Sequence, residues 1–509
     1  MWKRTRNKII ENVKIEKIWF GWIGIAHTED GKTILVSGGV LPNMIVDVKI
    51  LRKKSDFIKT QAIKVNAWNI DLNKTKICKH HFVFDTNLFT NTENENTAKV
   101  GCGGCKWQIL PYEEQLNLKE QVVKDSFAGC DFFDNVYEWI IWCKKIFNYR
   151  NKMEFSFWKY IVNKRSEKNS EELRREKEVF SNWSLGFHKQ GQFSKIVDID
   201  SCLIAGEKIN EIFAYLKEKI KNSALPVYDQ FNHSWFLRHL VIREGSNTGQ
   251  ILVNLVVASK YLDENKKDIS KWTKLQQDLM QDDYLKENIT TFIITENNGL
   301  ADVVKWQDIK TIPLWGWGNI FEKLIIDNEE INFRVSAFSF FQTNTYQAQV
   351  LFQTAKDMLP KINWNVLDLY CGAWTIWISL LKIWVWENLL WVEIVEDAVK
   401  DAYKNAEINW IKGKCKFIAD KAENINFEAE NIWVVVIDPP RSGLHPKVVD
   451  FLVQLKLRYN FPLLYISCNP VTMARDLKML EQGGWEVKKL KAVDMFPHTH
   501  HIEMIGLLK

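Results

Sequence analysis

The sequence contains no run of about 18 uncharged apolar residues, the length that a membrane-spanning helix needs. The N-terminal residues, Met-Trp-Lys-Arg-Thr-Arg-Asn-Lys, also lack the apolar stretch of a signal peptide. We therefore expect a cytoplasmic protein with no membrane partner. Because the cytoplasm keeps thiols reduced, the nine cysteines are expected to be free thiols or metal ligands before they are disulfides.

Glycine is scarce and tryptophan is abundant. The chain of 509 residues has 23 Gly, where ~36 would be average, and it also has 23 Trp. Several indoles stand where a tight turn normally has Gly, including Trp19, Trp22, Trp315 and Trp317. Either the protein uses Trp unusually often, or the gene uses a stop-type codon for Gly that was translated as Trp.

Positive charge is concentrated near the N-terminus. Residues 1–67 hold 13 Lys/Arg and 6 Asp/Glu, a net charge of +7, whereas the whole chain carries +5. The same residues alternate short apolar runs with Gly-containing turns, which predicts a small OB-like β-barrel. A basic module of this kind favours a polyanion partner, most simply RNA. A solvated terminal arm is the alternative interpretation.

The length of the chain predicts about three domains. After the barrel, residues 68–330 mix helical and strand patterns, with helices expected at residues 112–127 and around residues 209–220. Residues 331–509 repeat a strand-then-helix order, which predicts a Rossmann-like, doubly wound parallel sheet. The predicted fold class is therefore α/β, with a central α+β domain between the barrel and this sheet.

Four apolar strands of the C-terminal domain end at residues that can do chemistry, namely Asp368, Glu393, Asp438 and Cys468. Since the carboxyl ends of parallel strands meet at one edge of a sheet, we expect these side chains to line one ligand crevice. Acidic residues that close two successive strands are typical of a site for an adenosine-type cofactor.

Cys468 is the candidate nucleophile, because it ends the apolar run 461–466 and precedes Asn-Pro. The alternative is that it is a buried small hydrophobe, as a lone Cys after a strand often is. Near the C-terminus, three His precede Glu503. We do not interpret them as a metal site, because their spacing lacks the helical register of a zinc motif.

Five motifs occur in an order that resembles one family. They are Phe-Phe-Gln at 340–342, Asp-Leu-Tyr-Cys-Gly at 368–372, Asp-Pro-Pro-Arg at 438–441, Ser-Cys-Asn-Pro at 467–470 and Phe-Pro-His-Thr-His-His-Ile-Glu at 496–503. They resemble the S-adenosylmethionine-dependent RNA (uracil-5-)-methyltransferases. The N-terminal barrel is similar to the TRAM domain of this family. Together with a Cys-Gly-Gly-Cys motif at 102–105, it points to the branch that acts on 23S ribosomal RNA, expected here as a monomer.

The resemblance also implies roles for individual residues. Carbon 5 of uracil is a poor nucleophile, so Cys468 is expected to add to C6 first and Glu503 to remove the C5 proton afterwards. The positions expected to contact S-adenosylmethionine are Gln342, Tyr370, Thr375, Glu393, Asp420 and Asp438.

The resemblance implies a 4Fe-4S cluster as a second cofactor. Its four thiols would be Cys78, Cys102, Cys105 and Cys202, and four thiolates are what such a cluster requires. Zinc bound by four Cys is the physical alternative. The gap of 23 residues between Cys78 and Cys102 is longer than the family pattern.

Trp374 stands where the cofactor turn of the family has Gly, and Trp391 stands at another Gly position. An indole at residue 374 would fill space that the cofactor needs, because Gly lets the backbone approach the ligand. One alternative is therefore a non-catalytic iron-sulfur RNA-binding paralogue with a blocked pocket. Another is an amino-group methyltransferase, which would use the Asp-Pro-Pro turn but would need no Cys.

Overall fold

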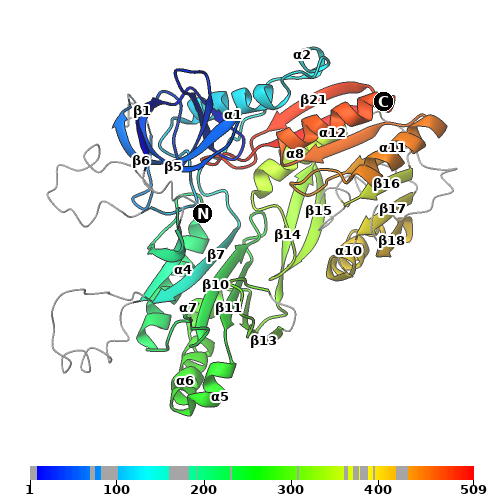
Figure 1. Cartoon of the computed structure of the whole chain (residues 1–509). Coiled ribbons are helices and arrows are strands. Elements are labelled where there is room, and N and C mark those ends of the chain that lie inside the picture. The colour runs from blue at the N-terminus through cyan, green and yellow to red at the C-terminus, as the bar shows by residue number, and fades with distance from the viewer. Residues whose placement is uncertain are drawn as a thin grey trace. The chain divides into compact units, whose positions relative to one another are not determined.

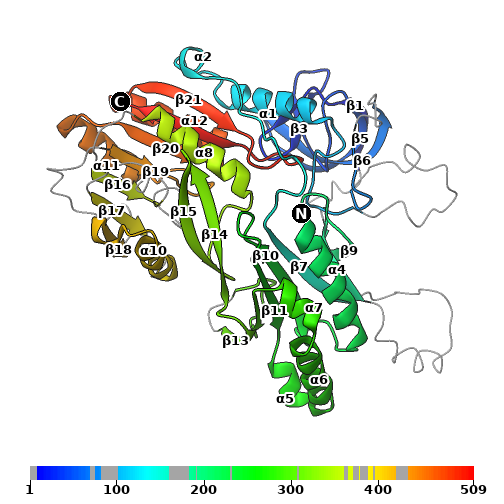
Figure 2. The same ribbon diagram turned by 180° about the vertical axis from the view of Figure 1, so that it is seen from behind.

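The computed structural model describes residues 8–68, 75–81, 101–159, 183–190, 192–229, 232–305, 309–359, 365–370, 378, 388–393, 396–419 and 434–509. The chain divides into two compact units. The first consists of Met1–Val100, Gly104–Ile146 and Gln347–Lys509, and the second of Gly101–Gly103 and Phe147–Tyr346. Figures 1 and 2 show the helices and strands from opposite sides. The three domain boundaries expected from the sequence stay a prediction.

The N-terminal strands of the first unit form a six-stranded sheet. In spatial order they are β1 (Ile9–Lys14), β5 (Ile45–Lys53), β6 (Phe57–Ala67), β4 (Thr33–Ser37), β3 (Ile23–His27) and β2 (Lys17–Trp19). Alternate side chains such as Val46, Val48 and Ile50 are buried, because one face of β5 covers the core. The predicted strands are present. Closure into a barrel stays a prediction, since β1 and β2 are the edges in this strand order.

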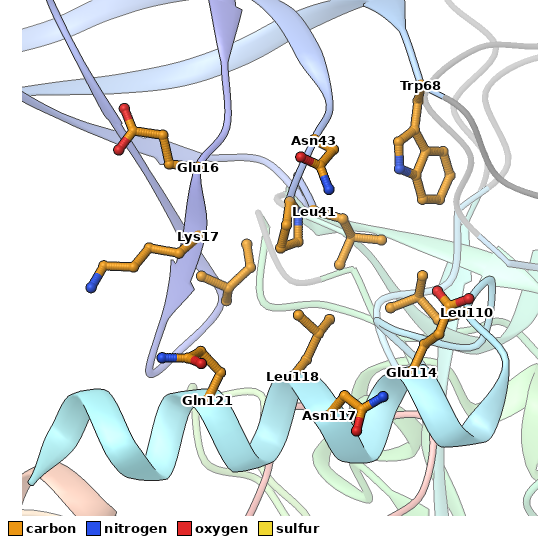
Figure 3. A pocket seen from close by; sticks show the side chains of 12 residues that line it. Glu16, Lys17, Leu41, Asn43, Trp68, Leu110, Glu114, Asn117, Leu118 and Gln121 are labelled. Atoms are coloured by element: carbon orange, nitrogen blue, oxygen red, sulfur yellow. The ribbon is translucent and has the colours of Figure 1, made fainter.

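Helix α1 (Tyr112–Ser126) packs near this sheet and matches the predicted helix. Glu113 and Glu114 in its first turn complement the positive end of the helix dipole. A cavity of ≈ 410 Å³ lies between α1 and the N-terminal strands and is lined by residues of both (Figure 3). Its walls combine apolar side chains such as Leu118 with amides such as Asn117.

The C-terminal part of the first unit is a seven-stranded sheet. Its order is β18 (Cys415–Ala419), β17 (Asn388–Glu393), β16 (Asn365–Leu369), β19 (Val434–Ile437), β20 (Leu463–Ser467), β22 (Glu503–Leu508) and β21 (Val487–Val493). The first five strands are parallel, and β22 is antiparallel to both of its neighbours. The predicted parallel sheet is confirmed, and the antiparallel pair at its end is a feature that the sequence pattern did not predict.

Helices connect and flank this sheet. They are α8 (Thr345–Met358), α10 (Glu396–Ile408), α11 (Pro446–Arg458) and α12 (Pro470–Gln482), with the 3-10 turn η5 (Lys412–Lys414) and the short α2 (Phe133–Val136) (Figures 1 and 2). All five residues of β20 are buried, as expected for a strand covered on both faces. Residues from α1, α11 and α12 share one apolar core with β19, β20 and β22.

The second unit contains another seven-stranded sheet. Its order is β13 (Lys310–Trp315), β12 (Thr291–Glu296), β11 (Ile251–Val257), β10 (Leu237–Glu244), β7 (Lys152–Lys159), β8 (Trp183–Lys189) and β9 (Gln192–Asp198), and β14 (Asn319–Ile326) pairs with β15 (Glu329–Ser336). The helices are α4 (Glu207–Asn222), α5 (Lys260–Glu264), η4 (Lys266–Asp268), α6 (Ile269–Met280) and α7 (Asp283–Asn288). Helix α4 is the predicted amphipathic helix, and its apolar face is buried.

None of the helices in the described part of the chain combines the length and apolar character needed to span a bilayer.

Candidate active site

The strand order of the C-terminal sheet reverses direction at β16. From this strand the chain proceeds to β17 and β18 on one side and to β19 and β20 on the other. Such a reversal of strand order is where doubly wound sheets bind their ligands, at the carboxyl ends of the strands.

The carboxyl ends of three parallel strands share one edge of the sheet because the strands are in register. Leu369 pairs with Val392 of β17 and with Ile437 of β19. The residues that follow these three, Tyr370, Glu393 and Asp438, therefore share one edge of the sheet. The Asp438 backbone N–H donates to the Leu369 carbonyl at 3.4 Å. Asp368 lies one residue before the end of β16, where it pairs with Trp391 and Val436. The expectation that Asp368, Glu393, Asp438 and Cys468 line one ligand crevice stays a prediction.

The antiparallel pairing of β20 with β22 brings Cys468 to Glu503. Ser467 is the register partner of Met504, so the next pair along these strands is Cys468 and Glu503. On the other side of β22, Glu503 pairs with Val493 of β21. Two residues 35 positions apart in the sequence, 468 and 503, are therefore neighbours across one ladder.

Burial controls the titration of the two carboxyl groups. It raises the pKa of Glu503 from 4.5 to about 8, with a further contribution from the negative charge of Asp438. Burial also raises the pKa of Asp438 to about 7. The raised pKa makes the ionised form of Glu503 a stronger base than an ordinary carboxylate, which suits a group that accepts a proton from a substrate.

The Cys468 thiol is also held in its protonated form. Burial raises its pKa to about 11, and the carboxyl groups of Glu503 and Asp438 add to this effect. The Arg441 guanidinium opposes the shift, both as a positive charge and as a hydrogen-bond donor. Arg441 is thus the group at this site that favours the thiolate, a role that the sequence interpretation did not assign to it.

Asn469 and Pro470 have structural roles beside the thiol. The Asn469 side chain caps α12 by accepting the N–H groups of Val471 and Thr472 at 3.1 and 3.5 Å. Pro470 occupies the first position of the helix, where its missing N–H is not needed. The Asn469 amide also donates to the Arg441 carbonyl at 2.8 Å. The motif therefore fixes the turn that carries Arg441.

The expected cofactor positions are described only in part. Tyr370 follows β16 with a φ of 64°, and Glu393 closes β17. Gln342 lies in the second unit, where its carbonyl accepts the Asn151 amide at 2.9 Å. Thr375 and Asp420, like Trp374, lie outside the described residues. Acidic residues at these strand ends fit S-adenosylmethionine, because carboxylates accept hydrogen bonds from ribose hydroxyls and attract the cationic sulfonium and ammonium groups.

The proposed cluster ligands are not assembled into a metal site in the described part of the chain. The eight described cysteines are thiols, but no group of three or more His, Cys, Asp or Glu there is arranged to hold a metal ion. Cys78 and Cys105 belong to the first unit, and Cys102 and Cys202 belong to the second. This geometry does not support the iron-sulfur cluster, which stays a prediction.

Fold and crevice together define a class of protein: a doubly wound enzyme that binds a nucleoside-type cofactor beside a thiol and a buried carboxyl group. Comparison with known proteins narrows this class. A sequence profile described as tRNA (Uracil-5-)-methyltransferase matches residues 111–509, and the chain belongs to this family.

Individual relatives agree with the family assignment. An uncharacterized RNA methyltransferase of Caldanaerobacter subterraneus is 30% identical over 508 residues, covering 98% of each chain. One of Clostridium acetobutylicum is 32% identical and covers 100% of this chain and 99% of its own. The crystal structure of Pyrococcus abyssi tRNA (uracil-54, C5)-methyltransferase with S-adenosyl-L-homocysteine matches with a TM-score of 0.65 at 25% identity, covering 98% of this chain and 100% of that one. The protein is thus an S-adenosylmethionine-dependent RNA methyltransferase of the uracil-5 family.

Proposed function

We propose that this enzyme methylates C5 of a uridine in RNA through a covalent bond between Cys468 Sγ and C6 of the base. The observation that carries the proposal is the register of β20 and β22, which places a thiol and a buried carboxyl group side by side. An amino-group methyltransferase would need neither the Cys nor its carboxyl partner.

Each step of the reaction has a residue that can perform it. The partly exposed Cys468 thiol first gives its proton to solvent, and the Arg441 guanidinium stabilises the thiolate. The thiolate then attacks C6, and the electron pair of the C5–C6 double bond moves toward the C4 carbonyl as an enolate. Bound S-adenosylmethionine supplies the methyl group that C5 takes up. Glu503 then accepts the C5 proton, the double bond forms again, and the C6–S bond breaks to release Cys468.

RNA containing 5-fluorouridine tests this mechanism, because fluorine cannot leave C5 as a cation and the adduct stays covalent. The parent protein should form a complex that survives denaturing electrophoresis, and Cys468→Ala should form none. Glu503→Gln should still form the complex, since proton removal follows adduct formation. If Cys468→Ala traps as well as the parent, the assignment of the nucleophile is wrong.

The substrate that we propose is 23S ribosomal RNA, bound in part by a TRAM-like N-terminal domain of residues 1–67. The excess of Lys and Arg in these residues supports RNA binding. The cavity beside α1 supports it too, because the unpaired bases of single-stranded RNA bind in clefts lined by aromatic and amide groups such as Trp68, Asn43 and Asn117 (Figure 3). Methyl transfer to 23S rRNA and to tRNA transcripts should be compared, and exclusive transfer to tRNA would reject the ribosomal substrate.

We also propose the 4Fe-4S cluster on Cys78, Cys102, Cys105 and Cys202. The support is the Cys-Gly-Gly-Cys motif and the partial exposure of all four thiols, in contrast to the buried Cys130 and Cys143. Protein purified without oxygen should be brown and contain about four iron atoms per chain, and Cys102→Ser should lose both. Stoichiometric zinc without iron would show that the rival metal is bound.

The non-catalytic paralogue is the second candidate, and genuine Trp at residue 374 would favour it. Among the described residues, three Trp have the left-handed backbone conformation that Gly adopts most readily: Trp22 at a φ of 65°, Trp235 at 81° and Trp410 at 62°. This supports the interpretation that some Trp are Gly in the cell. Reading the codons at 374, 377 and 391 decides between the active enzyme and the non-catalytic paralogue. Ordinary Trp codons at these positions would favour the paralogue, because the indole of Trp374 would then block the cofactor pocket.

A further inference from the structure

The loop of residues 494–502 connects β21 to β22 and ends at Glu503. Val493, the last residue of β21, pairs with Glu503, the first residue of β22. The loop is therefore a hairpin connection, and the candidate base Glu503 follows it directly. The loop has no helix or strand of its own, so other contacts must fix its conformation.

A buried ion pair joins the start of the loop to helix α1. Lys119 Nζ lies 2.6 Å from Asp494 Oδ1, and both side chains are fully buried. Lys119 also donates to the Phe496 carbonyl at 3.1 Å, and the Tyr112 hydroxyl donates to Asp494 Oδ2 at 2.7 Å. The Phe496 N–H donates to Asp494 Oδ1 at 3.1 Å. A buried pair of this kind adds little net stability but fixes one geometry, since either charge alone would be costly.

Gln115, one turn earlier on α1, holds the middle of the loop. Its side-chain oxygen accepts the His498 N–H at 2.8 Å, and its amide nitrogen lies 3.1 Å from His498 Nδ1. The Trp107 N–H donates to the His498 carbonyl at 3.0 Å. His498 has a φ of 67°, a left-handed conformation that persists only when its surroundings determine it.

The second half of the loop contacts Arg441, the residue that influences the Cys468 thiol. The Thr499 hydroxyl donates to the Phe496 carbonyl at 2.7 Å and accepts the His501 N–H at 3.3 Å. His501 Nδ1 lies 3.4 Å from Arg441 Nη2, and Arg441 acts on Cys468. A series of contacts therefore runs from α1 through the loop to Arg441, the group that lowers the pKa of the Cys468 thiol.

We propose that Lys119 is a positioning residue, through which α1 holds the 494–502 loop so that Glu503 and Arg441 face Cys468. This rests on the covalent mechanism proposed above for its catalytic consequence. Loss of the ion pair should loosen the loop and impair removal of the C5 proton more than formation of the adduct. Glu503 follows the loop directly, whereas Cys468 lies in the turn between β20 and α12.

The test is the double variant Lys119→Met/Asp494→Asn, which removes both charges at nearly constant volume and leaves no buried lone charge. Hydrogen exchange of peptides covering 494–502 should become at least tenfold faster, and peptides of β20 and α12 should be unchanged. Turnover on RNA should fall tenfold or more, while trapping by 5-fluorouridine RNA falls less than threefold. Ordinary RNA should then accumulate as a covalent complex.

Two further variants control the experiment. Lys412→Met removes an exposed ion pair with Glu407 in the same unit and should change neither exchange nor turnover. Lys119→Arg with Asp494 intact should restore most of the turnover. Unchanged loop exchange in the double variant, or equal losses of trapping and turnover, would overturn the positioning role. If the parent itself does not trap, the covalent mechanism fails, but the exchange result still decides whether α1 holds the loop.

Discussion

At the scale of single residues, the site surrounds its reactive groups largely with protein, since Glu503 is buried and Cys468 and Asp438 are partly buried. The pKa values of Glu503 and Asp438 rise to about 8 and about 7, and that of the Cys468 thiol rises to about 11. Burial is the largest cause in each case. Such a site favours proton transfer among its own groups and with a bound base, because the protonated and ionised forms of Glu503 are close in free energy near neutral pH.

Replacing Glu503 with Gln should stabilise the protein at high pH. The pKa of Glu503 is raised on folding from 4.5 to about 8, so the folded state binds more protons than the unfolded state between these values. Stability is therefore lost as pH rises through this window. The free energy of unfolding of Glu503→Gln, measured in urea, should exceed that of the parent by about 2–4 kcal/mol at pH 9 and should differ little from it at pH 4. A gain of the same size at both pH values would contradict this origin.

Replacing Trp410 with Gly should also stabilise the protein. Helix α10 ends in a Schellman motif, in which the Trp410 N–H bonds to the Glu407 carbonyl at 3.0 Å and the Ile411 N–H bonds to the Ala406 carbonyl at 2.9 Å. Residue 410 thus occupies the left-handed position that Gly prefers, and its indole is 92% exposed. Trp410→Gly should raise the free energy of unfolding by about 1 kcal/mol, because Gly adopts the left-handed conformation without steric cost. Thermal unfolding would measure this gain.

The matched control is Trp139→Gly. Trp139 is 56% exposed and does not have a positive φ, so Gly should be neutral or destabilising there. The same reasoning separates Trp410 from Trp485. The latter indole is buried, packs on Phe461 and donates to the Leu452 carbonyl at 3.3 Å. The hypothesis that some Trp positions are Gly in the cell is therefore supported at residue 410 and is not supported at residue 485.

At the scale of elements, the start of α12 connects helix capping to the active site. Asn469 both caps the helix and donates to the turn that carries Arg441. Asn469→Ala should therefore cost about 1 kcal/mol of stability from the lost cap, and methylation should fall as well. Asn469→Asp keeps the cap but loses the amide donor, so it should be nearly as stable as the parent and still be impaired. Equal activity of Asn469→Asp and the parent would show that the Arg441 turn does not need this bond.

At the scale of the whole molecule, charge is divided unevenly along the chain. The exposed residues Arg52, Lys53 and Lys54 at the end of β5 carry part of the N-terminal excess. Replacing all three with Gln should weaken RNA binding and reduce the slope of log affinity against log salt by about 1–2, because fewer counterions are released. The same replacement of Lys266, Lys267 and Lys271 in the second unit is the control. Identical slopes for both triple variants would argue against RNA contact at β5.

Local pattern was enough to predict a large part of the molecule. Apolar runs that end in Asp368, Glu393, Asp438 and Cys468 predicted the parallel strands, because a strand buried on both faces has to be apolar throughout. Alternation in residues 1–67 and helical spacing near Tyr112 were equally informative, since both periodicities come from the chain's own geometry.

The sequence by itself therefore determined the elements, the family motifs and which residues could react. Only the tertiary structure decided that β22 runs antiparallel beside β20, so that Glu503 meets Cys468, and that Lys119 of α1 pairs with Asp494. The physical reason is range. A strand's register and a buried ion pair depend on contacts between segments far apart in the sequence, and no local periodicity encodes the partner of either.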